Sequence, residues 1–162
     1  METAKFRVWN GREMVYDIMV GKFGIFYVNP EKGDGLNPKD TACLSENTTK
    51  YPEGTPLMRF TELPDINGKE IYEGDITQLV LPNREKRIFV VKIKKVIREV
   101  VNHPHFNDKK SKVSIFGVVF SWNGYDLFPC VDFDGISDNL KMEVIGNIYE
   151  NPELLNQKGK KK

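Results

Sequence analysis

Alternating hydrophobic and polar residues run through much of the chain and predict a protein built mainly from β-strands. Residues 5–9 alternate, Asn10-Gly11 is a pair typical of tight hairpin turns, and residues 14–20 continue as a second strand. The expected pairing places Phe6 and Val8 on the face that we expect to be buried. The opposite face of the hairpin alternates cations with aromatic rings.

A second hairpin is predicted closer to the C-terminus. Residues 113–122 are rich in β-branched and aromatic side chains, Asn123-Gly124 supplies the turn, and residues 125–133 return. This pairing gathers six large apolar side chains on one face, which we expect to be core: Phe116, Val118, Phe120, Trp122, Tyr125 and Leu127. Residues 24–28 and 141–149 are further predicted strands.

The segment at residues 86–101 fits two periodicities. Arg87, Phe89, Val91 and Ile93 alternate as in a strand, whereas the apolar residues from Ile93 to Val101 also fit a helical spacing. The β-branched content favours a strand, at least as far as Ile93. Residues 94–101 remain open between strand and helix.

Two tight corners are predicted within residues 60–76. The first is Pro64-Asp-Ile-Asn-Gly68, where Asn67 and Gly68 tolerate positive φ and Asp65 can accept hydrogen bonds from backbone amides two residues on. The second is Glu73-Gly74-Asp75, which leads into the apolar strand 76–81. A Gly-Asp corner that feeds an apolar strand is common in small SH3-like barrels.

Three blocks of the sequence together resemble the YopX family. These blocks are residues 60–76, the C-terminal run Val144-Ile-Gly-Asn-Ile-Tyr-Glu-Asn-Pro-Glu-Leu-Leu155, and the opening Lys5-Phe-Arg-Val-Trp9. The resemblance implies an accessory product of a phage or prophage, chiefly of Gram-positive bacteria, and supplies no catalytic residue. We assign a structural role to the motif residues Asp65, Asn67, Gly68, Tyr72, Gly74, Asp75, Gly146, Asn147, Asn151 and Pro152.

We expect a mainly β fold in which an N-terminal hairpin sheet packs on an SH3-like barrel. Residues 1–56 would form the hairpin lobe with a long polar loop from residue 29, which is either functional or mobile. Residues 57–155 would form the barrel lobe. A short C-terminal helix would begin with Asn151 as its cap and Pro152 at its first position. The basic tail 156–162 is expected to be disordered.

Charge is distributed unevenly and raises the question of nucleic acid. Residues 84–112 hold ten Lys and Arg against three Asp and Glu, although the formal net charge of the chain is only +1. A basic segment of this kind can track phosphates, and exposed rings can stack on bases. The candidate nucleic-acid-binding residues are Arg7, Trp9, Tyr16, Lys92, Lys94, Lys95 and Arg98. A solvated charged face explains the same residues.

Chemical sites are poorly supported. His103 and His105 have only Asp108 at nearby ligand spacing, so we predict no metal site and no cofactor. Cys43 and Cys130 have no partner at ligand spacing and are expected to be free thiols. The glycine-rich residues 32–35 lack the spacing of a phosphate-binding loop.

The leading functional hypothesis is a non-catalytic binding module of phage or prophage origin. We expect it to act in the cytoplasm of the bacterial host on a macromolecule of host or phage, with a protein partner favoured over nucleic acid, and homo-oligomerisation is one option. No apolar run approaches the roughly 20 residues that span a membrane, so no membrane partner is expected. The alternatives are nucleic-acid binding through residues 84–112 and a small enzyme that uses the acidic corner from Asp65 to Asp75.

Overall fold

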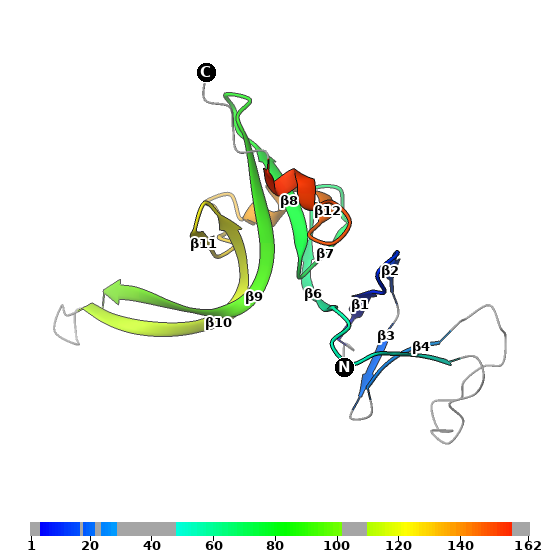
Figure 1. Cartoon of the computed structure of the whole chain (residues 1–162). Coiled ribbons are helices and arrows are strands. Elements are labelled where there is room, and N and C mark those ends of the chain that lie inside the picture. The colour runs from blue at the N-terminus through cyan, green and yellow to red at the C-terminus, as the bar shows by residue number, and fades with distance from the viewer. Residues whose placement is uncertain (1–3, 17, 22–23, 29–47, 102–109, 157–162) are drawn as a thin grey trace. The chain divides into compact units, whose positions relative to one another are not determined.

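The computed structural model describes the chain except for residues 1–3, 17, 22–23, 29–47, 102–109 and 157–162 (Figure 1). Strands dominate, and no α-helix occurs among the described residues, which confirms the mainly β class. The chain divides into two units, residues 1–60 and 61–162, and each is described by itself. Strand β6 (Leu57–Pro64) runs from the first unit into the second.

Short antiparallel strands make up the first unit. The predicted N-terminal hairpin forms with a four-residue connection, in which the Asn10 side chain accepts hydrogen bonds from the amides of Arg12 and Glu13. β1 also pairs with the first residues of β6, and β4 lies between β3 and β5. The strands are β1 (Phe6–Trp9), β2 (Met14–Val15), β3 (Ile18–Gly21), β4 (Gly24–Val28) and β5 (Thr48–Tyr51).

Strand β5 was not predicted, because its residues belong to a polar run that we expected to be loop. The β-branched Thr48 and Thr49 pair with β4 in an antiparallel ladder. The glycine-rich residues 32–35, Cys43 and the rest of 29–47 lie outside the described residues.

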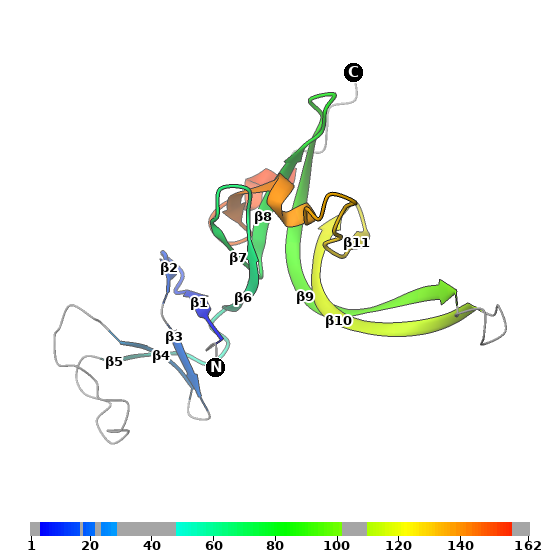
Figure 2. The same cartoon turned by 180° about the vertical axis from the view of Figure 1, so that it is seen from behind.

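A curled antiparallel sheet of five strands organises the second unit, in the order β11-β10-β9-β8-β12 (Figures 1 and 2). β9 and β10 form a long hairpin, and β11 and β12 are the edge strands. The short β7 lies before β8 in the chain and neighbours β6. The strands are β7 (Glu70–Tyr72), β8 (Asp75–Val80), β9 (Lys86–Val101), β10 (Lys110–Trp122), β11 (Tyr125–Leu127) and β12 (Met142–Asn147).

The core of the second unit lies among β7, β9, β10 and β12. It is formed by apolar side chains from several strands, and Phe89 packs edge-on against Phe120 with ring centroids 6.4 Å apart. Burial of such rings is a large part of the stabilisation of a small domain. The buried cluster consists of Ile71, Phe89, Val91, Phe120, Met142 and Val144.

Residues 86–101 form one continuous strand, so the favoured interpretation is confirmed and the helical one is wrong. β9 pairs with β10 from Val90 to Val101 without a shift of register. The strand extends beyond Ile93 because each β-branched residue there also has a partner on β10. Pairing with β10 stabilises the strand more than the helical spacing of its apolar residues could stabilise a helix.

The predicted aromatic core face is only partly correct. Phe120 is buried and Val118 and Trp122 pack against the core, but Phe116 and Tyr125 are largely exposed. The register places these side chains on one face as expected. The core covers only the middle of that face, which alternation along the strand could not reveal.

Both helical segments in the described part of the second unit are 3-10 helices. η3 (Asp138–Lys141) precedes β12 and was not predicted. η4 (Pro152–Asn156) stands where the short C-terminal helix was expected, and Pro152 does occupy its first position. None of the η4 residues is buried; Leu154 is half-buried and Leu155 is exposed.

Gly74 provides a direct test of this fold. Its φ of 82° lies in the left-handed region, and its amide donates to the carbonyl of Val91 over 2.9 Å. We expect Gly74→Val to lower the free energy of unfolding by about 1 to 3 kcal/mol in chemical denaturation, because a β-branched residue is strained at that φ.

The matched control is Gly117→Ala. A Cβ at Gly117 would lie 3.8 Å from the Phe128 ring, which is ordinary van der Waals contact, and its φ is not positive. Equal stability of the Gly74→Val variant and the wild type would contradict the proposed strain at this corner.

Candidate interaction surface

Asp65 links the first predicted corner to the last strand. Its carboxylate is 1% exposed; Oδ1 accepts from the amides of Asn67 (2.8 Å) and Lys69 (2.9 Å), and Oδ2 accepts from the amide of Val144 (2.9 Å). The Ile66 amide donates to the carbonyl of Met142 over 2.9 Å. The corner therefore occupies hydrogen-bonding groups along the outer edge of β12.

The second corner is held by Asp75 and Gly74. Asp75 is buried, and its Oδ2 accepts from the amide of Tyr72 over 2.7 Å. The carbonyl of Gly74 accepts from the amide of Ile148 over 2.9 Å. This corner consequently joins β7, β8 and the segment that follows β12.

The C-terminal block closes on itself through two asparagines. Asn147 is buried, and its Oδ1 accepts from the amides of Tyr149 (3.0 Å) and Glu150 (2.9 Å). A Cβ at Gly146 would lie 2.8 Å from the Cγ of Asn151, so a glycine is needed there for Asn151 to pack closely. The motif residues thus have structural contacts within the fold.

The carboxylates of the acidic corner bond to groups of the fold. In addition to Asp65 and Asp75, Glu70 Oε2 accepts from the hydroxyl of Tyr72 over 2.7 Å, and Glu73 Oε1 accepts from the amide of Ile93 over 3.4 Å. Carboxylates that satisfy buried amides stabilise turns and strand ends. This geometry gives the corner a folding role.

The proposed aromatic and cationic platform of the first unit does not form as predicted. Arg7 is only 3% exposed, and its neighbour Val8 is also buried. Because adjacent residues of a strand point to opposite faces, both faces of β1 are covered. Tyr16 is exposed and Trp9 is half-buried, so Arg7 does not join them as the surface cation that was expected there.

The basic residues of the β9–β10 hairpin are divided between its two faces. Lys92, Lys94 and Arg98 lie on one face, and Lys95 lies on the other, because the strand alternates without interruption. Lys94 Nζ is 2.6 Å from Asp126 Oδ2. Arg98 lies over the Phe128 ring and donates to the carbonyl of Asp126.

The face that carries Lys94 and Arg98 is covered in part by β11 and the residues after it, whereas Val100 and Ile115 on the same face are 36% and 38% exposed; we call it the covered face. Val96 and Val119 are buried, and the Phe128 ring approaches the backbone at Gly117. The hydrogen bond from Lys94 keeps the pKa of Asp126 below its ordinary value, with a smaller contribution from Ser121. Two of the predicted nucleic-acid-binding cations are therefore engaged within the unit.

The opposite face of the same hairpin is exposed at all of its positions beyond the core; we call it the open face. Ile97, Val101 and Phe116 are 63%, 71% and 70% exposed. Residues that lie directly opposite one another in the β9–β10 ladder share a face, and this pairing defines which residues belong to the open face. The open face consists of Lys95, Ile97, Glu99, Val101, Lys110, Lys112, Ser114 and Phe116.

In the described part of the chain, no further strand pairs with the far part of the β9–β10 hairpin. β8 pairs with β9 only through Lys86–Val90, and β11 pairs with β10 only through residues 120–122. Both views show the two strands continuing beyond β8 and β11 (Figures 1 and 2). A two-stranded ribbon is only marginally stable in water without a packed face, so its exposed apolar residues are notable.

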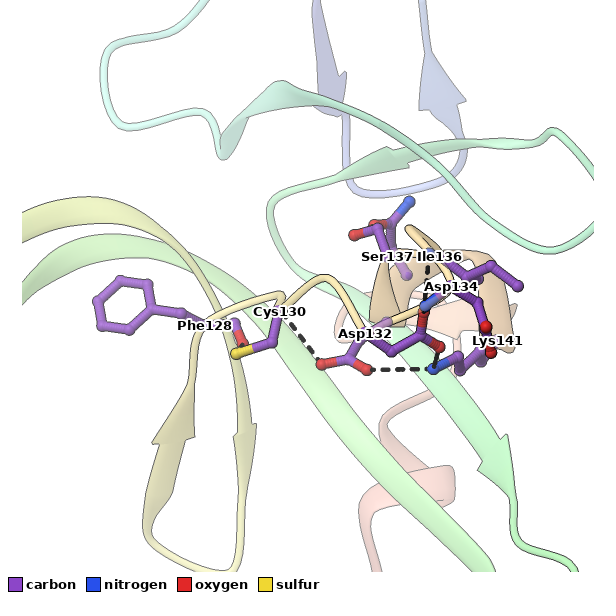
Figure 3. A network of polar contacts seen from close by, with 9 residues as sticks. Phe128, Cys130, Asp132, Asp134, Ile136, Ser137 and Lys141 are labelled. Atoms are coloured by element: carbon purple, nitrogen blue, oxygen red, sulfur yellow. Dashed lines mark hydrogen bonds and ion pairs between the residues drawn. The ribbon is translucent and has the colours of Figure 1, made fainter.

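A second exposed apolar feature is the turn at residues 132–136, between β11 and η3 (Figure 3). Asp132 Oδ1 accepts from the amides of Asp134 (3.0 Å) and Ile136 (2.9 Å), and Lys141 Nζ lies 2.6 Å from Asp132 Oδ2. The side chain of Phe133 in this turn is fully exposed. The turn therefore presents an aromatic ring from a hydrogen-bonded base.

An ion pair between Lys141 and Asp132 stabilises the base of this turn. The hydrogen bond with Lys141 lowers the pKa of Asp132, and the same contact raises the pKa of Lys141. Asp138 Oδ2 accepts from the amide of Cys130 over 3.0 Å. Sequence reasoning missed this turn, although the spacing Asp132-Phe-Asp-Gly135 is a turn signal.

Within the described residues, no group of three or more His, Cys, Asp or Glu side chains is arranged to hold a metal ion. His103 and His105 lie outside the described residues, as does the basic tail from residue 157. Cys130 is exposed and is a free thiol. No helix in the part of the chain that the structure describes is long and apolar enough to cross a membrane.

These features define a small mainly β protein whose sequence motifs secure the corners and the last strand of a curled sheet. The family model described as YopX protein matches residues 5–156, so the chain belongs to the YopX family. A search of curated proteins found no match.

The chain is also similar to a solved structure described as the crystal structure of protein EF1440 from Enterococcus faecalis. The sequence identity is 22%, the match covers 96% of this chain and 99% of that chain, and the TM-score is 0.47.

The structural role of Asp65 predicts a large stability effect. We expect Asp65→Ala to lower the free energy of unfolding by about 3 kcal/mol or more, because three amides lose a buried acceptor. The control is Glu143→Ala, which removes an exposed carboxylate on β12. Similar chemical denaturation midpoints for the two variants would contradict the role of Asp65.

The ion pair between Lys94 and Asp126 predicts that removal of Lys94 changes the pKa of Asp126. We expect Lys94→Met to raise the pKa of Asp126 towards the value of an ordinary aspartate, measured by NMR titration of the side-chain carboxyl. Since that pKa is lowered in the folded protein, the contact contributes stability at neutral pH and loses it as the pH falls through that pKa.

The control for this titration is Lys112→Met, which removes a cation from the open face. We expect the pKa of Asp126 to stay at its wild-type value in that variant. An unchanged pKa in the Lys94→Met variant would show that Lys94 does not pair with Asp126 in solution.

Proposed function

We propose that this protein is a non-catalytic binding module that engages a macromolecular partner through the open face of the β9–β10 hairpin. The observation that carries the proposal is the exposure of Ile97, Val101 and Phe116, at 63%, 71% and 70%, on one face of a ribbon whose other face is partly covered. Contiguous exposed apolar residues bordered by charges are characteristic of interaction surfaces.

The composition of the open face favours a protein partner over nucleic acid. Its apolar residues suit a protein surface, and its cations include Lys110, which is paired with Glu99 over 2.7 Å. Lys94 and Arg98 are occupied on the covered face. Nucleic acid remains the second candidate because Lys95 and Lys112 stand exposed on the same face as Phe116, an arrangement that can serve phosphates and bases.

We also infer that the second unit is an opened SH3-like barrel. Five strands in a curled antiparallel sheet, with a 3-10 helix between the fourth and fifth strands along the chain, support this inference. The C-terminal turn η4 stands in the place of the expected helix. The resemblance to the family supports an origin in a phage or prophage and action in the bacterial cytoplasm.

The test is capture of a partner by tagged protein from a lysate of the bacterial host that also contains an untagged copy of this chain, with and without nuclease. We expect wild-type protein to retain a protein partner after nuclease treatment, and we expect Ile97→Ser combined with Phe116→Ser to lose it. Val80→Ser is the control, since Val80 is an exposed apolar residue at the other end of the sheet.

Two outcomes would contradict this function. Retention of the same partner by the double variant would show that the open face is not the binding surface. Material that disappears from wild-type protein on nuclease treatment would favour nucleic acid, with a steep dependence of affinity on salt. Thermal unfolding of each variant checks that it remains folded.

A further inference from the structure

We propose that the partner of the open face is the turn at residues 132–136 of a second copy of this chain. The proposal rests on the proposed function, because it requires the open face to be a binding surface. It makes the open face and the turn at residues 132–136 complementary halves of one contact. The chain would then assemble through two different surfaces of the same unit.

The turn has the form of an anchor. Its backbone is fixed by the two amide hydrogen bonds to Asp132, by the hydrogen bond from the Gly135 amide to the Asp132 carbonyl (3.0 Å), and by the pairing with Lys141. A rigid aromatic side chain loses little conformational entropy when it binds, so such residues are frequent at the centres of interfaces. Phe133 is the exposed aromatic residue of this turn.

The two surfaces are complementary in chemistry. On the open face, Phe116 and Ile97 provide an apolar area, and Lys95 lies directly opposite Phe116 in the ladder. On the turn, Phe133 is flanked by Asp132 and Asp134. Aromatic packing at the centre with opposite charges at the rim gives both affinity and orientation.

A contact within one chain is disfavoured by the direction in which the chain leaves β11. Phe128 lies against Gly117 and Arg98 on the covered face, and the turn follows only a few residues later. The open face is on the other side of the ribbon. The turn of the same chain would have to pass around the hairpin, whereas the turn of a second copy can approach the open face directly.

Because the two surfaces differ, the contact has two closed forms. Two copies can exchange turns reciprocally in a dimer, or one contact can repeat around a ring. Both forms require the same pair of residues to meet, Lys95 of one copy and Asp134 of another. A charge exchange between these positions therefore tests the contact in either symmetry.

The experiment is sedimentation equilibrium of wild-type protein, Lys95→Glu, Asp134→Lys and an equimolar mixture of the two variants. We expect wild-type protein to associate, each variant alone to associate at least about tenfold more weakly, and the mixture to recover association. Lys86→Glu is the control, because it makes the same charge change at the opposite end of β9. Thermal unfolding confirms that each variant is folded.

A wild-type protein that stays monomeric at high concentration, or variants that associate as strongly as wild type, would overturn the proposal. So would a mixture that fails to recover. Photo-crosslinking then separates failure of this proposal from failure of the proposed function. The crosslinker p-benzoylphenylalanine is placed at position 116, and the protein is irradiated in host lysate.

Three outcomes of the crosslinking distinguish failure of the second-copy contact from failure of the proposed function. A product of two copies joined through a peptide that contains Phe133 supports the second-copy contact. A crosslink to a different protein or to nucleic acid overturns the second-copy contact and leaves the open face as a binding surface. Recovery of uncrosslinked protein alone overturns both.

Discussion

The outer edge of β12 is the constraint on which the second unit depends. An edge strand carries backbone groups that need partners, and here the corner at residues 64–69 supplies them through the buried carboxylate of Asp65 and the amide of Ile66. The contact between Asp65 and Val144 joins residues 79 positions apart in the chain. The strand so held contributes Met142 and Val144 to the core.

The hairpin of β9 and β10 uses the sheet in a different way. Its base contributes Phe89, Val91 and Phe120 to the core, and its alternation continues outwards after the neighbouring strands have ended. Asp126 and Phe128 cover part of one face of this extension, and the other face is exposed. The motif residues therefore build the fold, whereas the exposed apolar residues of the hairpin lie in a segment with no recognised motif.

Local features of the fold could be predicted from the sequence because their causes are local. The corners at Asp65 and Gly74 follow from residue types that accept amide hydrogen bonds or tolerate positive φ, and the strand as far as Ile93 follows from β-branching. The bond from Asp65 to Val144, the burial of Arg7 and the exposure of Phe116 could not be predicted. Alternation shows which side chains share a face, whereas tertiary packing decides whether that face is covered.

We infer that the motif residues form one cooperative structural unit around the edge of β12. Native-state hydrogen exchange of the Val144 amide, which donates to Asp65, tests it most directly. We expect this amide to exchange only through global unfolding, with an opening free energy equal to the free energy of unfolding from chemical denaturation. An opening free energy well below that value, while the amides of β8 still require global unfolding, would contradict the claim.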